Sequence, residues 1–340
     1  MKKLLKFLGY TLVALVCLVL GAVTYLNVFL PKVKAAEDIK IEATVARVAR
    51  GKYLANNVSD CIGCHSIRDW GTYGGPIVAG SEYAGGEPIF DKGIGLPGSV
   101  PPKNLTPYNL KNYTDGQLVR ALRTGVRANG EPLFPLMPYQ RFAGYSKEDL
   151  YSIIAYLRSL PEVKKDIPEH KLDFPVNLIV RTIPKDAPEF PADPDRKDTV
   201  AYGKYLVNAA ACMECHSPVD DHHEPIADMY LAGGQEYPSP DETMDIAKAG
   251  RLRIPNITPD PETGIGNWDK KTFLARFQAY RGKNGEKARV KVKRGEPNTI
   301  MPIYAFADMT DEDISAIYDY LRTIKPVKHK VERYTPPANL

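Results

Sequence analysis

The 340-residue sequence contains few of the residues that mark specialised protein classes. It holds five cysteines, six histidines and two tryptophans, and its formal net charge is only +4. So few cysteines argue against a scaffold held by disulfides, and so small a charge does not favour nucleic-acid binding. The absence of a long low-complexity run excludes collagen-like, coiled-coil and disordered chains. The length leaves room for two domains of about 100–150 residues each.

One long apolar run is present at the N-terminus. Residues 7–30 contain no charged side chain, and lysines flank them on both sides: Lys2, Lys3, Lys6, Lys32 and Lys34. A helix of this length reaches about 36 Å, enough for a hydrocarbon core of about 30 Å. This length predicts a membrane anchor. The alternative is a signal peptide cleaved near Ala35, but the apolar run of a signal peptide is usually only about 7–15 residues long. The leading lysines predict a cytoplasmic N-terminus, with the rest of the chain outside.

Five short segments occur twice in the same order, which predicts a tandem duplication. They are Gly-Lys-Tyr-Leu at 51–54 and 203–206, Cys-x-x-Cys-His at 61–65 and 212–216, Asn-Leu/Ile-Thr-Pro at 104–107 and 256–259, Met-Pro at 137–138 and 301–302, and Tyr-Leu-Arg at 156–158 and 320–322. We therefore expect an anchor at 1–36, domains at 37–165 and 198–328, a Pro-rich linker at 166–197 and a tail at 329–340. The linker carries an apolar stretch, so we expect it to lie docked on a domain surface.

Both copies are predicted to be helical. Ser146 and Asp149 form a helix-capping pattern that precedes an apolar stripe at Leu150, Ile153, Ile154 and Leu157. Thr310 and Asp313 repeat the cap in the second copy. The predicted fold class is all-α, with two tandem domains behind a single N-terminal transmembrane helix.

The two Cys-x-x-Cys-His segments carry the predicted chemistry. Cysteines at i and i+3 lie on one side of a helical turn, where they can form thioethers with the vinyl groups of one haem, and the histidine then ligates the iron. A zinc site would need further ligands, and the first copy has no other cysteine or histidine. A redox pair would not need the histidine. The sequence predicts two covalently bound haem c groups, held by Cys61, Cys64 and His65 and by Cys212, Cys215 and His216.

The second axial ligand of each iron follows by elimination. Between residues 37 and 165 Met137 is the only methionine, and its counterpart in the second copy is Met301. These two methionines are the predicted partners of His65 and His216. The second copy also offers side chains without a counterpart in the first: Met213, Met229, Met244, Met309, His222, His223 and His329. Iron closed by histidine and methionine favours electron transfer over reaction with a bound substrate.

These motifs together resemble the cytochrome c family, more closely the tandem-domain cytochrome c subunits of periplasmic alcohol, aldehyde and gluconate dehydrogenases. The resemblance covers about residues 45–327 and includes Thr-Gly-Ile-Gly-Asn-Trp at 263–268, which the first copy lacks. Those subunits usually carry three haems, whereas this chain has motifs for two. The resemblance implies the cytochrome c fold, axial histidine and methionine, and electron transfer.

The expected protein is an electron carrier without catalytic residues of its own. We expect it in the bacterial inner membrane, crossing once through residues 7–30, with its haem domains on the periplasmic side. Expected partners are membrane-bound or periplasmic redox proteins: a dehydrogenase, a quinol-oxidising complex or a terminal oxidase. Two alternatives stay open: a haem enzyme of the di-haem peroxidase or thiosulfate dehydrogenase type, and an integral subunit of a larger respiratory complex.

Basic residues have two further predicted roles. Arg123, Arg127, Arg276 and Arg281 are candidates to pair with haem propionates, or else form exposed cationic faces. Residues 281–294 carry seven basic side chains and one acidic one. Alternation at 287–293 predicts a short β-ribbon near the second haem, which either steers an acidic partner or is a solvated insertion.

Overall fold

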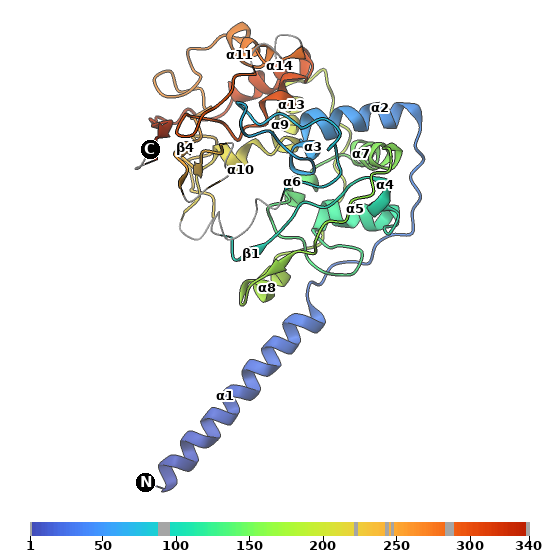
Figure 1. Cartoon of the computed structure of the whole chain (residues 1–340), viewed down its shortest axis with the longest axis vertical. Helices are drawn as coiled ribbons and strands as arrows, with labels where there is room; N and C mark the ends of the chain where they lie inside the picture. The colour runs from blue at the N-terminus through green and yellow to red at the C-terminus, as the bar shows by residue number, and fades with distance from the viewer. Residues whose placement is uncertain are drawn as a thin grey trace.

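A computed structural model describes residues 2–87, 96–220, 224–241, 245, 248–282 and 289–337. Helix α1 (Lys2–Phe29) projects from a globular body that contains both copies of the repeat (Figure 1). Its most apolar window has a mean hydropathy of 2.4 and is fully outside the body. By length and composition α1 meets the requirements of a membrane span, as a secretory signal sequence near the N-terminus also would.

The body is mostly helical, as predicted. The first copy contains α2 (Val45–Tyr53), a π-helical turn η1 (Leu54–Val58), α3 (Cys61–Cys64), α4 (Pro107–Leu110), α5 (Asp115–Thr124), α6 (Tyr139–Phe142) and α7 (Lys147–Ser159). The second contains α9 (Thr199–Ala209), α10 (Cys212–His216), α11 (Lys270–Gln278), α13 (Ile303–Ala307) and α14 (Asp311–Leu321).

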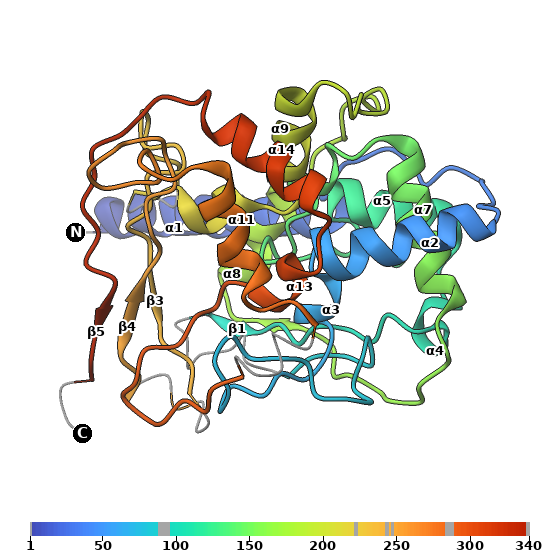
Figure 2. The same ribbon diagram turned by 90° about the horizontal axis from the view of Figure 1, so that it is seen from above.

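Two small antiparallel sheets were not foreseen in the all-α prediction. Strands β3 (Glu236–Pro238), β4 (Arg251–Arg253) and β5 (Tyr334–Thr335) lie side by side in the second copy (Figure 2). Strand β1 (Gly98–Ser99) of the first copy pairs with β2 (Lys171–Leu172) of the linker. Strands of two or three residues are too short to show an alternating pattern in the sequence.

The predicted caps and apolar stripes are confirmed. The Ser146 hydroxyl accepts a hydrogen bond from the Asp149 N–H at the start of α7, and Thr310 does the same for Asp313 at the start of α14. The stripe residues that follow are almost fully buried: Leu150, Ile153, Ile154, Leu157, Ile314, Ile317 and Leu321. Each stripe forms part of one continuous core that extends through both copies.

The first and last helices of each copy cross at a glycine. Helix α2 packs on α7, and α9 packs on α14. A methyl group on Gly51 would overlap the Ser152 carbonyl, and one on Gly203 would overlap the Ala316 carbonyl. The repeated Gly-Lys-Tyr-Leu segment therefore allows two backbones to touch where any side chain would separate them.

The Pro-rich linker lies against the first copy, as a docked segment should. Besides the β1–β2 pairing, the Asp173 N–H donates to the Pro97 carbonyl at 2.9 Å. The linker then forms α8 (Val176–Ile179) and the 3₁₀ turn η3 (Val180–Thr182). Leu178 and Val180 are buried there, and the Arg123 guanidinium stacks over the Phe190 ring at 3.6 Å.

The two copies pack through reciprocal contacts, in which equivalent residues of each copy bond the other. The Tyr53 hydroxyl in the first copy donates to Asp313 in the second at 2.6 Å. The Tyr205 hydroxyl in the second copy donates to Asp149 in the first at 2.7 Å. The same oxygens accept the backbone N–H groups of the helix caps, Tyr53 from Thr310 at 3.2 Å and Tyr205 from Ser146 at 3.3 Å. The tyrosine of each repeated Gly-Lys-Tyr-Leu segment therefore binds the cap of the other copy.

A second pair of contacts has the same symmetry. The Asn57 side-chain amide donates to the Ala305 carbonyl at 3.2 Å, and the Asn208 amide donates to the Arg141 carbonyl at 3.0 Å. Contacts exchanged in this way are the mark of an isologous interface, as in a two-fold dimer. The chain folds as a covalently joined pseudo-dimer.

The basic segment of the second copy pairs with the first copy. Thr72 and Lys291 form an antiparallel bridge, and Lys291 also makes an ion pair with Asp69 at 3.1 Å. The expected ribbon at 287–293 is thus wrong for its described part, because residues 290–292 find their hydrogen bonds on a distant loop. Residues 283–288, including Lys287, lie outside the described residues.

The reciprocal tyrosines generate a stability prediction. Tyr53→Phe and Tyr205→Phe should each lower the free energy of unfolding by about 2 kcal/mol, because each removes from a buried carboxylate the hydroxyl donor that the other copy supplies. Urea unfolding followed by circular dichroism measures the change. Tyr108→Phe is the matched control, since its hydroxyl bonds Asp166 on the surface, and should cost less than about 0.5 kcal/mol. Equal stability of all three variants would contradict the interface.

Candidate functional site

Both Cys-x-x-Cys-His segments form single helical turns, α3 and α10. The chain enters each turn through a residue with left-handed backbone conformation, Asp60 at φ 47° and Ala211 at φ 51°. Few non-glycine residues adopt this conformation, and here two equivalent positions share it. The sharp entry starts a helix directly at the first cysteine, so that the two thiols of each motif lie one turn apart.

The histidine that follows each turn is held by a backbone carbonyl. His65 Nδ1 lies 2.6 Å from the Lys103 oxygen, and His216 Nδ1 lies 2.9 Å from the Pro255 oxygen. Because a carbonyl only accepts, Nδ1 carries the proton and Nε2 keeps its lone pair. Burial lowers the pKa of both rings, that of His216 to about 4, which keeps them neutral. This tautomer and this outer hydrogen bond are what an iron-ligating histidine needs.

The repeated Asn-x-Thr-Pro segment holds the carbonyl that orients each histidine. The Asn104 side-chain oxygen accepts from the Thr106 N–H at 2.8 Å, and its amide donates to the Val163 carbonyl at 2.8 Å. Asn256 makes the same two bonds, to Thr258 at 2.9 Å and Val327 at 2.8 Å. These hydrogen bonds join the loop that follows Lys103 or Pro255 to the segment after the last helix of the same copy. The repeat is visible in the sequence, but its role in holding the carbonyl is not.

The thiols are in an environment unlike that of a redox pair. All five cysteines are free of disulfides. Burial raises the pKa of Cys61 and of Cys212 to about 12. Thiol–disulfide enzymes lower this pKa instead. Within the described part of the chain, no group of three or more His, Cys, Asp or Glu side chains is placed to hold a metal ion.

The two candidate methionines occupy equivalent positions. Met137 precedes α6 and Met301 precedes α13, and both are partly buried against the core that Cys61 and Cys212 also contact. Of the rivals, Met309 lies inside the core at 2% exposure, and His329 Nδ1 faces the Ala232 carbonyl at 3.0 Å. Met244, His222 and His223 lie outside the described residues. Ligation by Met137 and Met301 stays a prediction.

Buried donors gather in the first copy. The Nε–H groups of three arginines and one tyrosine hydroxyl are buried without a partner among the described residues: Arg120, Arg123, Arg127 and Tyr139. Tyr139 packs so closely that a methyl group on Gly125 would overlap its ring. Buried donors are seldom left unpaired, and a cofactor that bears carboxylates would satisfy them. The residues present thus fit a haem with its propionates.

The second copy uses its arginines differently. Arg281 makes an ion pair with Asp311 at 2.7 Å and donates to the Ala307 carbonyl at 2.6 Å. Arg276 lies over the Trp268 ring at 5.6 Å. Both guanidinium groups therefore have roles within their own copy. Arg123 and Arg127 bond the linker instead, Arg123 through the Pro188 carbonyl and Arg127 through Glu169 at 2.9 Å, while the Nε–H of each finds no acceptor in the described chain.

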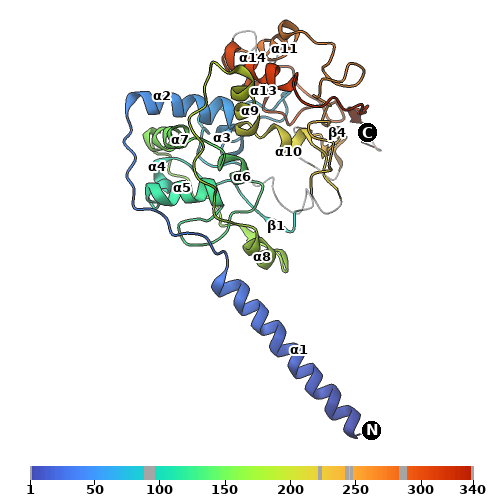
Figure 3. The same ribbon diagram turned by 180° about the vertical axis from the view of Figure 1, so that it is seen from behind.

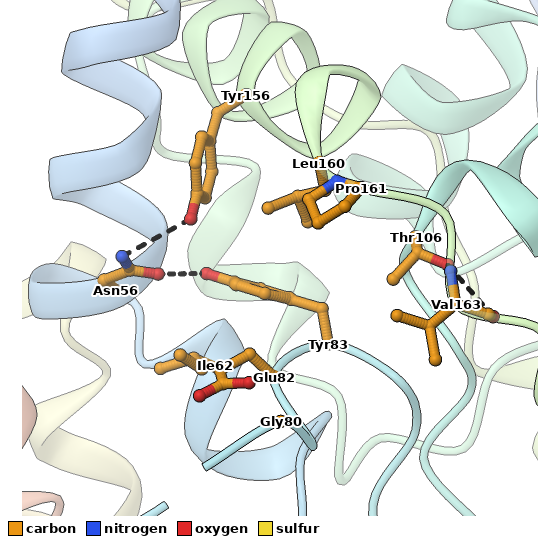
Figure 4. Close-up of a pocket in the computed structure, with 10 residues that line it drawn as sticks. All are labelled: Asn56, Ile62, Gly80, Glu82, Tyr83, Thr106, Tyr156, Leu160, Pro161 and Val163. Carbon is orange, nitrogen blue, oxygen red and sulfur yellow. Dashed lines mark hydrogen bonds between the residues drawn. The ribbon is translucent and has the colours of Figure 1, made fainter.

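A cavity of about 320 Å³ lies behind the first motif. Figure 4 shows Ile62 of α3 on one wall and Leu160, just after α7, on another. The Tyr83 hydroxyl donates to the Asn56 side-chain oxygen, and the Asn56 amide donates to the Tyr156 hydroxyl at 3.5 Å. These polar groups bond one another, and the bonds join the η1 turn to α7 and to the loop that carries Tyr83.

The second motif contacts the first copy directly. Arg141 of α6 makes an ion pair at 2.5 Å with Glu214, inside the second motif. The helix that follows Met137 in the first copy therefore contacts the second motif directly.

Comparison with known proteins agrees with this geometry. The family model for cytochrome c matches the chain twice, over residues 48–161 and 200–325. The fructose dehydrogenase cytochrome subunit of Gluconobacter japonicus is 33% identical over 291 residues, covering 82% of this chain and 52% of that protein. The alcohol dehydrogenase (quinone) cytochrome c subunit of Gluconacetobacter polyoxogenes is 28% identical, covering 86% of this chain and 59% of that protein.

A shorter relative matches over most of its length. The diheme cytochrome c-type protein of Cereibacter sphaeroides is 26% identical over 280 residues, covering 79% of this chain and 83% of that protein. By contrast, the chain spans little more than half the length of the two dehydrogenase subunits. The two family matches fall one on each copy of the repeat. The resemblance inferred from the motifs is confirmed, and the chain belongs to the cytochrome c family.

Proposed function

We propose that this chain transfers electrons through two covalent haem c groups, one in each copy. The observation that carries the proposal is the repeated pairing of a one-turn Cys-x-x-Cys helix with a histidine whose Nδ1 donates to a fixed carbonyl. Haem iron supplies one-electron exchange when bound. In this proposal Cys61, Cys64, Cys212 and Cys215 hold the two groups by thioether bonds.

The remaining residues of the site would ligate the iron and orient the haem. His65 and His216 would hold the iron through a neutral Nε2, and Met137 and Met301 would add thioether sulfur as its second protein ligand. Arg120, Arg123, Arg127 and Tyr139 would donate to the propionates in the first copy. Iron that has both protein ligands would leave no position for a substrate, which separates an electron carrier from a haem enzyme of the peroxidase type.

The domain plan and location belong to the same proposal. Residues 1–36 anchor the protein in the bacterial inner membrane, and domains at 37–165 and 198–328, joined by the linker at 166–197 and followed by the tail at 329–340, lie on the periplasmic side. Because several relatives are named as cytochrome subunits of dehydrogenases, we infer a dehydrogenase as electron donor. A quinol-oxidising complex or a terminal oxidase is the other class of redox partner.

Haem attachment is tested by counting haem. Replacing Cys61 and Cys64 with alanine should reduce the ratio of haem to protein from two to one, because thioether bonds at that motif are lost. The pyridine haemochrome spectrum of the purified, denatured protein measures the ratio. Cys17→Ser is the control and should leave two haems. A ratio of two in the double alanine variant would refute attachment at the first motif.

Axial ligation is tested with carbon monoxide. The reduced parent protein should not bind CO, whereas Met137→Ala should expose one iron, so that about half of the haem binds CO and the potential of that haem falls. Met301→Ala should do the same for the other haem. Met229→Leu, a change at a loop methionine without a counterpart in the first copy, is the control. CO binding by the parent at both haems would favour a haem enzyme instead.

A further inference from the structure

Two large apolar side chains are exposed beside the end of α1. Phe174 is 77% exposed and Ile179 is 53% exposed. Phe174 is the one exposed phenylalanine outside α1 in the part of the chain that the structure describes. Exposed apolar groups that lie together usually mark a surface that contacts something apolar.

The short helix that carries Ile179 has two different faces. Leu178 and Val180 point into the body and are 8% and 2% exposed, while Ile179 between them faces outward. Leu178 and Val180 hold α8 and η3 against the first copy, so the backbone that carries the outward side chains is packed on the body. We name Phe174, Ile179 and the backbone between them the linker tip.

The linker tip is fixed to the end of α1. Helix α1 contacts both α8 and η3. Arg181 donates to the Leu30 carbonyl at 3.0 Å and makes an ion pair with Glu131 of the first copy at 2.8 Å. The Lys34 N–H donates to Asp186 at 2.7 Å. In Figures 1 and 3, α8 is the part of the body that reaches furthest toward α1.

We propose that the linker tip is a second membrane contact, which inserts Phe174 and Ile179 into the lipid interface beside α1. The proposal rests on the membrane location proposed above. If residues 7–30 span the hydrocarbon core, the bilayer surface lies at Leu30, the residue to which Arg181 holds the tip. Aromatic and aliphatic side chains on a short amphipathic element favour this depth.

The surrounding charge fits anionic lipid headgroups. Exposed lysines flank the end of α1 and the linker tip: Lys32, Lys34, Lys171 and Lys185. Basic residues at a membrane surface add attraction to anionic lipids. A single spanning helix leaves the body free to rotate about the helix axis. A second contact fixes which face of the haem domains points along the membrane, where a membrane-bound redox partner meets it.

Depth-dependent quenching tests the contact in the full-length holoprotein. Phe174→Cys or Ile179→Cys, in a Cys17→Ser background, is labelled with NBD and placed in nanodiscs of phosphatidylethanolamine and phosphatidylglycerol. Lipid carrying a 5-doxyl acyl chain quenches a label at the interface. Val45→Cys and Val200→Cys are the controls, because both side chains are exposed and α2, which begins at Val45, lies on the opposite side of the body from α1 (Figure 1).

The expected result is a quenching ratio at 174 and 179 about twofold greater than at 45 and 200. Equal quenching at all four positions overturns the proposal and assigns the apolar tip to a protein partner or a second copy. The intact mass of the protein is measured first. If residues 1–36 have been removed, both the anchor and the linker-tip contact are overturned, while the haem spectrum reports separately on haem binding.

Discussion

The close crossing of the first and last helices in each copy is the constraint on which the other features depend. At Gly51 and Gly203 the backbones of the two helices touch, and no larger residue fits. The crossing fixes the position of α7 along the axis of α2 and the position of α14 along the axis of α9. It thereby places each capped helix start, with its buried aspartate, at the surface where the copies meet. Two residues after the glycine, Tyr53 or Tyr205 emerges at the same surface and bonds the aspartate of the other copy.

The two copies differ in sequence at positions that the helix crossing does not constrain. Gly63 in the first motif has no room for a side chain, because a methyl group there would overlap the Asp60 carboxylate. The second copy has Ala211 at the position of Asp60, so Glu214 fits at the position of Gly63 and reaches Arg141. One substitution thus permits the other, and the permitted glutamate adds an ion pair between copies. The equivalent residues Arg50 and Tyr202 likewise differ in type, yet each contacts the aspartate of its own copy.

The locally determined features of this fold could be predicted from sequence. The caps at Ser146 and Thr310, the apolar stripes and the motif turns depend on residues within one or two helical turns of each other. The contacts between copies could not, because Tyr53 and Asp313 are 260 positions apart and no local pattern couples them. The basic segment shows the same limit. Its alternation correctly indicated extended chain near Lys291, but its partner, Thr72, belongs to the other copy.

Electron transfer between cofactors depends on their separation, so the interface has a direct bearing on function. Helix α6 of the first copy contacts α10 of the second through Arg141 and Glu214, and the reciprocal tyrosines add hydrogen bonds between the copies. A flexible tether between two independent domains would leave this distance undefined. Here the linker adds a third connection, since it packs on the first copy and bonds the end of α1 through Arg181. Direct contacts therefore join the two copies, the linker and the end of α1, so that the linker both connects the copies and ties them to α1.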